Sequence, residues 1–254
     1  MQLMSFDLGQ IRLHCWMTTP VRFGVVLVVT AAFSGLGHLI HGVTLSGAMV
    51  GAMICFILFA SAGPGGFVVL LTLFIVTWIA TRLGRSRKQR LGTAERREGR
   101  TGSQVLANLG VAAICGMAHA FRGDPVWLLA MTAALAEAAS DTVSSEAGQA
   151  FSDQSRLLTT FETVPAGTDG GITLAGTIAG TGAALVISAV CTWTGILPAR
   201  WRWIAAAAGA LGMLADSLMG ALLERRGWLT NDTVNFAGTL IAAGLAAEYL
   251  ALFP

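Results

Sequence analysis

The chain has 254 residues, of which 54% are hydrophobic and only 12% charged, with a formal net charge of +2. Soluble domains carry about 25% charged residues, so this composition excludes an ordinary soluble domain and favours a membrane protein. Alternating segments of about ten residues, the pattern of a membrane β-barrel, do not occur, so we expect spanning helices.

Eight apolar segments are long enough to span a bilayer, which takes about 20 helical residues. In chain order they cover roughly 21–37, 43–61, 65–83, 104–121, 125–146, 171–195, 203–224 and 234–252. We therefore expect an all-α, polytopic membrane helix bundle that forms a single domain over residues 1–254. The first twenty residues lack the pattern of a cleavable signal peptide. The cysteines, which lack metal-ligand spacing, are expected to be packing residues; they are Cys15, Cys55, Cys115 and Cys191.

Half of the sixteen basic residues lie between Arg82 and Arg100, in a loop over 82–103. Because cytoplasmic loops are enriched in Lys and Arg, we expect this loop inside the cell and both termini outside. The loop is open to two interpretations: it sets the topology beside anionic lipid, or its arginines Arg96, Arg97 and Arg100 contact a polyphosphate.

The chain contains a candidate internal repeat. Residues 42–52 read GVTLSGAMVGA and residues 171–181 read GITLAGTIAGT, and Asn108 is echoed by Asn235. Paired segments run in the same direction in the expected topology, which predicts a parallel duplication of a four-helix unit with halves 21–122 and 125–252. The alternative is that small-residue membrane helices resemble one another by chance.

The acidic residues of the second half are the strongest candidates for chemistry, because charge within a membrane helix is costly. Glu137 and Asp141 are four residues apart and share a helix face. Glu146 points away if that helix continues, although Gly148 permits an early end. Asp216 lies about two turns inside the seventh segment. Facing carboxylates suit Mg²⁺, so we predict a metal site formed by Asp141, Glu137, Glu146 and Asp216.

A glycine-rich stretch, PAGTDGGITLAGTIAG at 165–180, follows these acids. Its glycines permit tight turns, and the next helix start offers free amides, which predicts a phosphate-binding turn at Gly167, Thr168, Gly170 and Gly171. The alternative is a closely packed helix preceded by an ordinary turn. Arg156 either neutralises phosphate or contacts lipid headgroups. Thr230 or Asn231 and Asp232 either cap the last helix or join the site.

Four motifs resemble an integral membrane family known as domain of unknown function 92. They are GRTGSQVLANLGVAA, SDTVSSEAGQ, TVPAGTDGGITLAGTIAG and LADSLMGALLERR. The family includes transmembrane protein 19 and the plant chloroplast phytyl-phosphate kinase, and the likeness covers about Thr44 to Gly244. A weaker likeness links the chain to the CTP-dependent phytol and dolichol kinases.

The resemblance implies a lipid kinase that uses CTP or another nucleoside triphosphate. It implies that Asp141 and Glu146 hold metal and nucleotide phosphates, and it matches further positions to the family motifs: Arg100, Gln104, Asn108, Asp216, Asp232 and Asn235. The chain departs from the expected pattern at Glu162, where a basic residue before the turn would help to bind phosphate.

From these observations we expect a membrane-embedded isoprenyl-phosphate kinase with Asp141, Asp216 and Arg100 as catalytic residues. Its partners would be Mg²⁺, CTP or another nucleotide, a prenyl-phosphate lipid and membrane lipids. We expect no nucleic acid as a partner, and homo-oligomers remain open. The lipid phosphate would lie at the cytoplasmic ends of the last four spans, in the inner membrane. A lipid or small-molecule transporter and a CDP-lipid-forming cytidylyltransferase are the alternatives.

Overall fold

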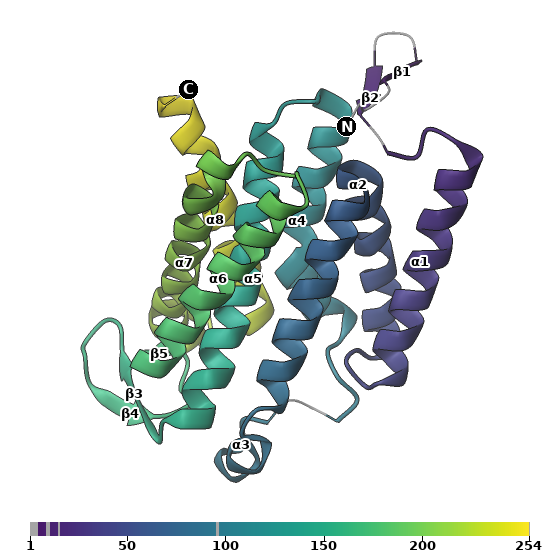
Figure 1. The fold of residues 1–254 in the computed structure, drawn as a ribbon. Coiled ribbons are helices and arrows are strands. Elements are labelled where there is room, and N and C mark those ends of the chain that lie inside the picture. The colour runs from purple at the N-terminus through teal and green to yellow at the C-terminus, as the bar shows by residue number, and fades with distance from the viewer. Residues whose placement is uncertain (1–4, 9–10, 15, 95–96, 254) are drawn as a thin grey trace.

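The computed structural model describes residues 5–8, 11–14, 16–94 and 97–253, so Cys15 and Arg96 lie outside the described residues. Helices dominate this part of the chain (Figure 1), which confirms the all-α membrane bundle. The helices are α1 (Pro20–Leu39), α2 (Leu45–Arg82), α3 (Arg85–Leu91), α4 (Gly102–Arg122), α5 (Val126–Phe151), α6 (Leu174–Trp193), α7 (Arg202–Met219) and α8 (Asn231–Leu252), with the short η1 (Ala199–Trp201) before α7 and the π-helix η2 (Gly220–Glu224) after it.

Two small antiparallel sheets, which the sequence did not predict, accompany the bundle. Strands β1 (Ser5–Leu8) and β2 (Ile11–His14) pair near the N-terminus. Strands β3 (Gln154–Leu157), β4 (Thr163–Pro165) and β5 (Gly171–Ile172) form a three-stranded sheet in the order β4-β3-β5. This second sheet connects α5 to α6 and positions the glycine-rich turn beside the helix ends.

Helix α2 folds back on itself. A straight helix of its 38 residues would be about 57 Å long, almost twice the hydrocarbon thickness of a bilayer. Gly63, followed by Pro64, has φ 67° and ψ −159°, and this non-helical residue reverses the chain. The rings of Phe59 and Phe67 consequently stack with centroids 5.7 Å apart, and Arg82 Nη2 donates to the carbonyl oxygen of Ile40 at 3.1 Å.

The expected spans 43–61 and 65–83 are thus the two arms of α2, which run side by side in Figure 1. Seven helices of the described residues are long and apolar enough to cross a membrane, and α2 is one of them. All eight apolar segments are therefore helical, and the second and third are two helices that meet directly at the non-helical Gly63.

The two ends of the bundle differ in what they carry. Figure 1 shows both termini at one end and α3 with the β3–β5 sheet at the other. The basic loop, the 147–170 connection and the turn before α8 therefore share one end, as the predicted threading requires. Which side of the membrane that end faces stays a prediction.

Helix α5 is the centre of the second half, because it contacts α4, α6, α7 and α8. Small residues allow this close approach. A Cβ added at Gly180 on α6 would lie 2.7 Å from the carbonyl oxygen of Ser140, and one added at Gly209 on α7 would lie 2.8 Å from the Cβ of Ala136. The acidic side chains of α5 are consequently surrounded by helices.

The predicted duplication has partial counterparts in the structure. Thr44 and Thr173, which cap α2 and α6, are 129 positions apart, and so are Thr101 and Thr230, which cap α4 and α8. The packing of the halves differs, since α4 lies against α2 whereas α8 packs chiefly against α5, α7 and α4. The duplication stays a prediction.

Candidate functional site

A polar cavity of about 120 Å³ lies where the end of α5 meets the glycine-rich turn, the end of α7 and the start of α8. We call it the acidic pocket. Its lining residues include Asp141, Ser144, Ser145, Gln149, Ser155, Gly167, Thr168, Asp169, Gly170, Gly171, Thr173, Asp216, Ser217, Glu224, Asn231 and Asn235. No Lys, Arg or His belongs to this lining, all of which is described, so a bound phosphate would need a cation to accompany it.

The central pair of the pocket is Asp141 on α5 and Asp216 on α7. Their carboxyl groups lie within hydrogen-bonding reach of each other, as the sequence predicted for acids facing each other across a cleft. Two further carboxylates that the sequence analysis did not assign, Asp169 and Glu224, line the same pocket and interact electrostatically with each other. The single turn of π-helix in η2 brings Glu224 to this position, and such turns are frequent at functional sites.

Glu137 lies one turn deeper than Asp141 and does not line the pocket. Its side chain is buried, with the residue 1% exposed, and Oε1 has no hydrogen-bond partner among the described residues. A Cβ at Gly238 of α8 would lie 2.5 Å from Oε1, so only glycine leaves room for this carboxyl group. Glu137 is therefore buried among α5, α7 and α8 and does not reach the solvent-accessible part of the site.

The glycine-rich turn is held on three sides. A Cβ at Gly170, whose φ is 73°, would lie 2.2 Å from the backbone nitrogen of Ala221 in η2. One at Gly171 would lie 2.3 Å from Ser155 Oγ, and one at Gly167, whose φ is 89°, would lie 2.5 Å from Thr93 Cγ2. The turn residues predicted to bind phosphate thus line the pocket, and the glycines are required by close approach of the neighbouring chain.

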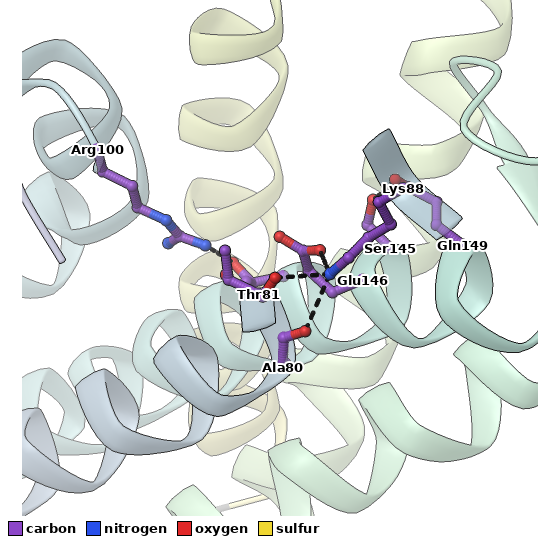
Figure 2. A network of polar contacts seen from close by, with 8 residues as sticks. Ala80, Thr81, Lys88, Arg100, Ser145, Glu146 and Gln149 are labelled. Carbon is purple, nitrogen blue, oxygen red and sulfur yellow. Dashed lines mark hydrogen bonds and ion pairs between the residues drawn. The ribbon is translucent and has the colours of Figure 1, made fainter. Parts of the chain in front are cut away.

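Glu146 is separated from the other acids because α5 continues to Phe151, so that this side chain points away from Asp141. Its carboxylate forms an ion pair with Lys88, which is 1% exposed. Figure 2 shows Lys88 Nζ also donating to the carbonyl oxygens of Ala80 and Thr81, at 3.2 and 2.7 Å. The predicted metal ligand Glu146 is instead part of the anchor that holds α3 against α5.

Three other expected site residues lie outside the acidic pocket. Arg156 is exposed, and strand alternation places it opposite Ser155, which faces the pocket. Gln104 forms a capping box with Thr101 at the start of α4. Asp232 lies in the first turn of α8, where Thr230 is the N-cap, so the capping interpretation accounts for this segment although Asn231 reaches the pocket.

The remaining expected residues, Arg97, Arg100 and Asn108, line a second and larger cavity of about 530 Å³. It lies in the first half of the chain, among α1, both arms of α2 and α4. Its walls are largely apolar, and four arginines gather at one end: Arg82, Arg85, Arg97 and Arg100. We call it the arginine-mouthed cavity. His41, which we did not assign from the sequence, also lines it, in a left-handed conformation with φ 56°.

Two contacts join the cavities. Arg100 Nη2 donates to Thr142 Oγ1 at 3.2 Å, which brings the guanidinium beside Asp141; Figure 2 shows this arginine reaching toward α5. With the Asn235 amide oriented to satisfy its neighbours, its nitrogen donates to Asp216 Oδ2 at 3.3 Å and its oxygen accepts from Asn108 Nδ2 at 3.2 Å. The asparagines of the candidate repeat thus meet at the boundary between the cavities.

The acidic pocket has the donors that Mg²⁺ prefers but not a complete coordination shell. No three His, Cys, Asp or Glu side chains of the described residues form a ready-made metal site. Mg²⁺ is commonly held by one or two carboxylates together with substrate phosphates and water. The Asp141–Asp216 pair fits that mode, in which the substrate supplies the missing ligands.

Comparison with known proteins places these features in a family. The family model described as integral membrane protein DUF92 matches residues 28–243. An uncharacterized membrane protein of Synechocystis is 34% identical over 195 residues, which cover 75% of this chain and 76% of that protein. An uncharacterized membrane protein of Methanocaldococcus jannaschii is 33% identical over 225 residues, which cover 89% of this chain and 93% of that protein.

A plant protein, the chloroplastic protein VTE6 of Arabidopsis thaliana, is 28% identical over 206 residues. The match covers 78% of this chain and 62% of that protein. No solved structure matches the chain. The family model covers most of the chain, and two relatives exceed 30% identity over three quarters of it or more, so the chain belongs to the DUF92 family of integral membrane proteins.

Proposed function

We propose that the protein is a membrane-embedded isoprenyl-phosphate kinase that converts a prenyl monophosphate to its diphosphate at the expense of CTP or another nucleoside triphosphate. The observation that carries the proposal is the acidic pocket itself, where four carboxylates and a glycine-rich turn meet at one end of the bundle. The resemblance to the phytyl-phosphate kinase family supplies the substrate class.

Asp141 and Asp216 would hold Mg²⁺ at the pocket, and Asp169 and Glu224 extend the negative surface around them. The bound cation would neutralise charge on the transferred phosphoryl group. The glycine-rich turn would bind nucleotide phosphates through its backbone amides. The pocket is smaller than the 300–1,000 Å³ typical of cavities that enclose a drug-sized ligand, so it fits the polyphosphate and leaves the nucleoside outside.

In the proposed reaction an oxygen of the lipid phosphate attacks the γ-phosphorus of the nucleotide. A new P–O bond forms, the bond between the γ-phosphorus and the β,γ-bridging oxygen breaks, and a nucleoside diphosphate leaves. The attacking phosphate oxygen already carries negative charge, so positioning and charge neutralisation supply most of the catalysis. Arg100 lies beside Asp141 and would orient the incoming phosphate.

The transporter alternative would require acids near the middle of the bundle that are reachable from both sides. The pocket lies instead at the bundle end that carries α3 and the β3–β5 sheet, which favours the enzyme. A cytidylyltransferase would use the same pocket but release pyrophosphate, so its products distinguish it from a kinase.

The direct test is turnover by the purified protein in detergent or nanodiscs with CTP, Mg²⁺ and phytyl or geranylgeranyl phosphate. We expect the lipid diphosphate and CDP as products, loss of activity with EDTA, and recovery on adding Mg²⁺. Asp216→Asn should lower kcat at least a hundredfold. The matched control Asp232→Asn, which changes an acid outside the pocket, should keep most of the activity.

Each outcome decides between the candidates. Release of pyrophosphate with a CDP-linked lipid would assign the protein as a cytidylyltransferase. Absence of turnover with every nucleoside triphosphate and prenyl phosphate tested would contradict the kinase proposal. Equal activity of Asp216→Asn and the unaltered protein would remove the acidic pocket from the mechanism.

A further inference from the structure

We infer that the lipid phosphate binds in the first half of the chain, with its tail in the arginine-mouthed cavity and its phosphate between the arginines of the mouth. This inference rests on the proposed function and names the binding site of its lipid substrate. It differs from the expectation of the sequence analysis, which placed the lipid phosphate at the ends of the last four spans.

The size and lining of the cavity fit a single hydrocarbon chain. Its volume of about 530 Å³ is within the range of small-molecule sites. Apolar side chains form most of the wall, among them Phe33, Leu70, Leu73, Phe74, Val105 and Leu109. On the second arm of α2 the lining extends from Arg82 to Leu70, a depth of about 18 Å at the helical rise of 1.5 Å per residue.

Gly51 leaves open space on the first arm of α2. A Cβ at Gly51 would meet nothing within 4 Å, although the residue lines the cavity. On the opposite wall, the Phe33 ring of α1 packs edge-to-face against Phe67 and Phe74. The cavity is therefore bounded by fixed aromatic side chains and has room for an extended chain alongside Gly51.

The mouth carries the positive charge of its four arginines. Arg82 lies with its guanidinium 3.7 Å from the ring centroid of Trp78 and is within electrostatic range of Arg85. The ion pairs found among the described residues are Arg87–Asp153 and Lys88–Glu146, so no described carboxylate forms a salt bridge with an arginine of the mouth. Arginine is well suited to phosphate because its planar fork donates two parallel hydrogen bonds.

Backbone contacts fix Arg100 at the inner edge of the mouth. Its N–H donates to the carbonyl oxygen of Gly42 at 3.1 Å, and its own carbonyl oxygen accepts from the Thr44 N–H at 2.9 Å. Gly99, with φ 84°, allows this approach, since a Cβ there would lie 2.5 Å from the backbone of Gly42. A phosphate bound at Arg100 would consequently lie beside Asp141, next to the pocket proposed for the nucleotide.

The charge and the lining of the two cavities therefore favour different substrates. The acidic pocket repels a lipid phosphate in the absence of a cation, whereas the arginines attract it. A nucleotide is a poorer occupant of the large cavity than a prenyl chain, because most of the exposed wall is apolar and burying a polar base against it costs free energy. A lipid that carries one terminal phosphate matches both the wall and the mouth.

The test measures binding separately from turnover. Equilibrium binding of radiolabelled geranylgeranyl phosphate to the purified full-length protein, without nucleotide, would be compared among variants. Gly51→Leu should lower the affinity at least tenfold for geranylgeranyl phosphate and less for the shorter geranyl phosphate. The matched control Gly182→Leu, at an α6 glycine that also has open space around it but does not line the cavity, should leave the affinity unchanged.

Charge at the mouth is tested in the same assay. The double variant Arg82→Gln with Arg85→Gln should weaken binding of geranylgeranyl phosphate at least tenfold and leave binding of the uncharged alcohol geranylgeraniol unchanged. Phosphatidic acid, a two-chain membrane lipid with the same headgroup chemistry, should compete poorly. Unchanged affinity in Gly51→Leu, or equal competition by phosphatidic acid, would overturn the inference.

Failure of the inference can be told apart from failure of the proposed function. If the unaltered protein binds the lipid phosphate but transfers no phosphoryl group, the kinase proposal fails and the binding site stands. If it is an active kinase whose KM for lipid phosphate is the same in Gly51→Leu and in Gly182→Leu, the kinase stands and the site is elsewhere.

Discussion

Single glycines determine the shape of the acidic pocket. Gly170 combines a left-handed backbone conformation with a neighbour, Ala221, that leaves no room for a side chain. Gly227, in the turn before α8, has nearly the same φ of 72° but open space around it. A side chain at Gly227 would therefore cause only backbone strain, whereas one at Gly170 would cause backbone strain and a steric clash. Comparing substitutions at the two positions separates these two effects.

Gly170→Ala should displace the turn from η2 and lower activity at least tenfold, together with a fall in thermal stability. Gly227→Ala should lower the free energy of unfolding by only about 1–2 kcal/mol, which is the cost of the left-handed conformation for a residue with a Cβ. Activity assays and thermal unfolding in detergent check both variants. A Gly170→Ala protein as active as Gly227→Ala would show that the position of the turn does not matter to the reaction.

Helix α3 illustrates how one buried ion pair organises an element. It has seven residues, too few to be stable alone, and it is fixed by Lys88 through Glu146 and the carbonyl oxygens at the end of α2. Arg85, at the start of the same helix, lines the arginine-mouthed cavity. The ion pair therefore positions a residue of the proposed lipid site without touching the lipid.

Lys88→Met should destabilise the fold by about 3–5 kcal/mol, because it leaves Glu146 without its cation. The double variant Lys88→Met with Glu146→Leu should recover much of that loss, since no unpaired charge remains. Arg90→Met, on the exposed face of α3, serves as the control and should have little effect. Thermal unfolding of the four proteins compares them, and equal stability of Lys88→Met and Arg90→Met would exclude the anchoring role.

At the scale of the whole molecule, the fold places all proposed chemistry at one end. The acidic pocket, the arginine mouth and α3 share that end, and both termini lie at the other (Figure 1). The positive-inside rule then predicts that the end with the acidic pocket and the arginine mouth faces the cytoplasm, where nucleotides are available.

Cysteine labelling checks this orientation. We expect a membrane-impermeant maleimide to label Phe253→Cys in intact cells and to label Thr160→Cys, between β3 and β4, only after permeabilisation. Both residues are exposed, whereas Cys55, Cys115 and Cys191 are buried; Cys15 would be replaced by Ser in both variants. Labelling of Thr160→Cys in intact cells would reverse the orientation and place the acidic pocket outside.

The sequence by itself determined the membrane class and the eight apolar segments, and it singled out Asp141, Asp216 and the glycine-rich turn, which the structure brings to one pocket. These features are local. Hydropathy over about 20 residues identifies a span, and an acidic residue within a span is rare, so it marks a candidate functional residue. The sequence also indicated that Glu146 would point away from Asp141 if its helix continued, and α5 does continue to Phe151.

Only the tertiary structure decided which side chains face one another. The partner of Glu146 is 58 positions away at Lys88, Arg156 is turned outward by its strand, and Asp169 and Glu224 join the pocket through a turn and a π-helix that hydropathy does not reveal. The arginine-mouthed cavity depends on the reversal of α2 at Gly63, which brings two arms and α1 around one space. Such features follow from the rotation and packing of helices distant in sequence, and no local pattern of residues specifies them.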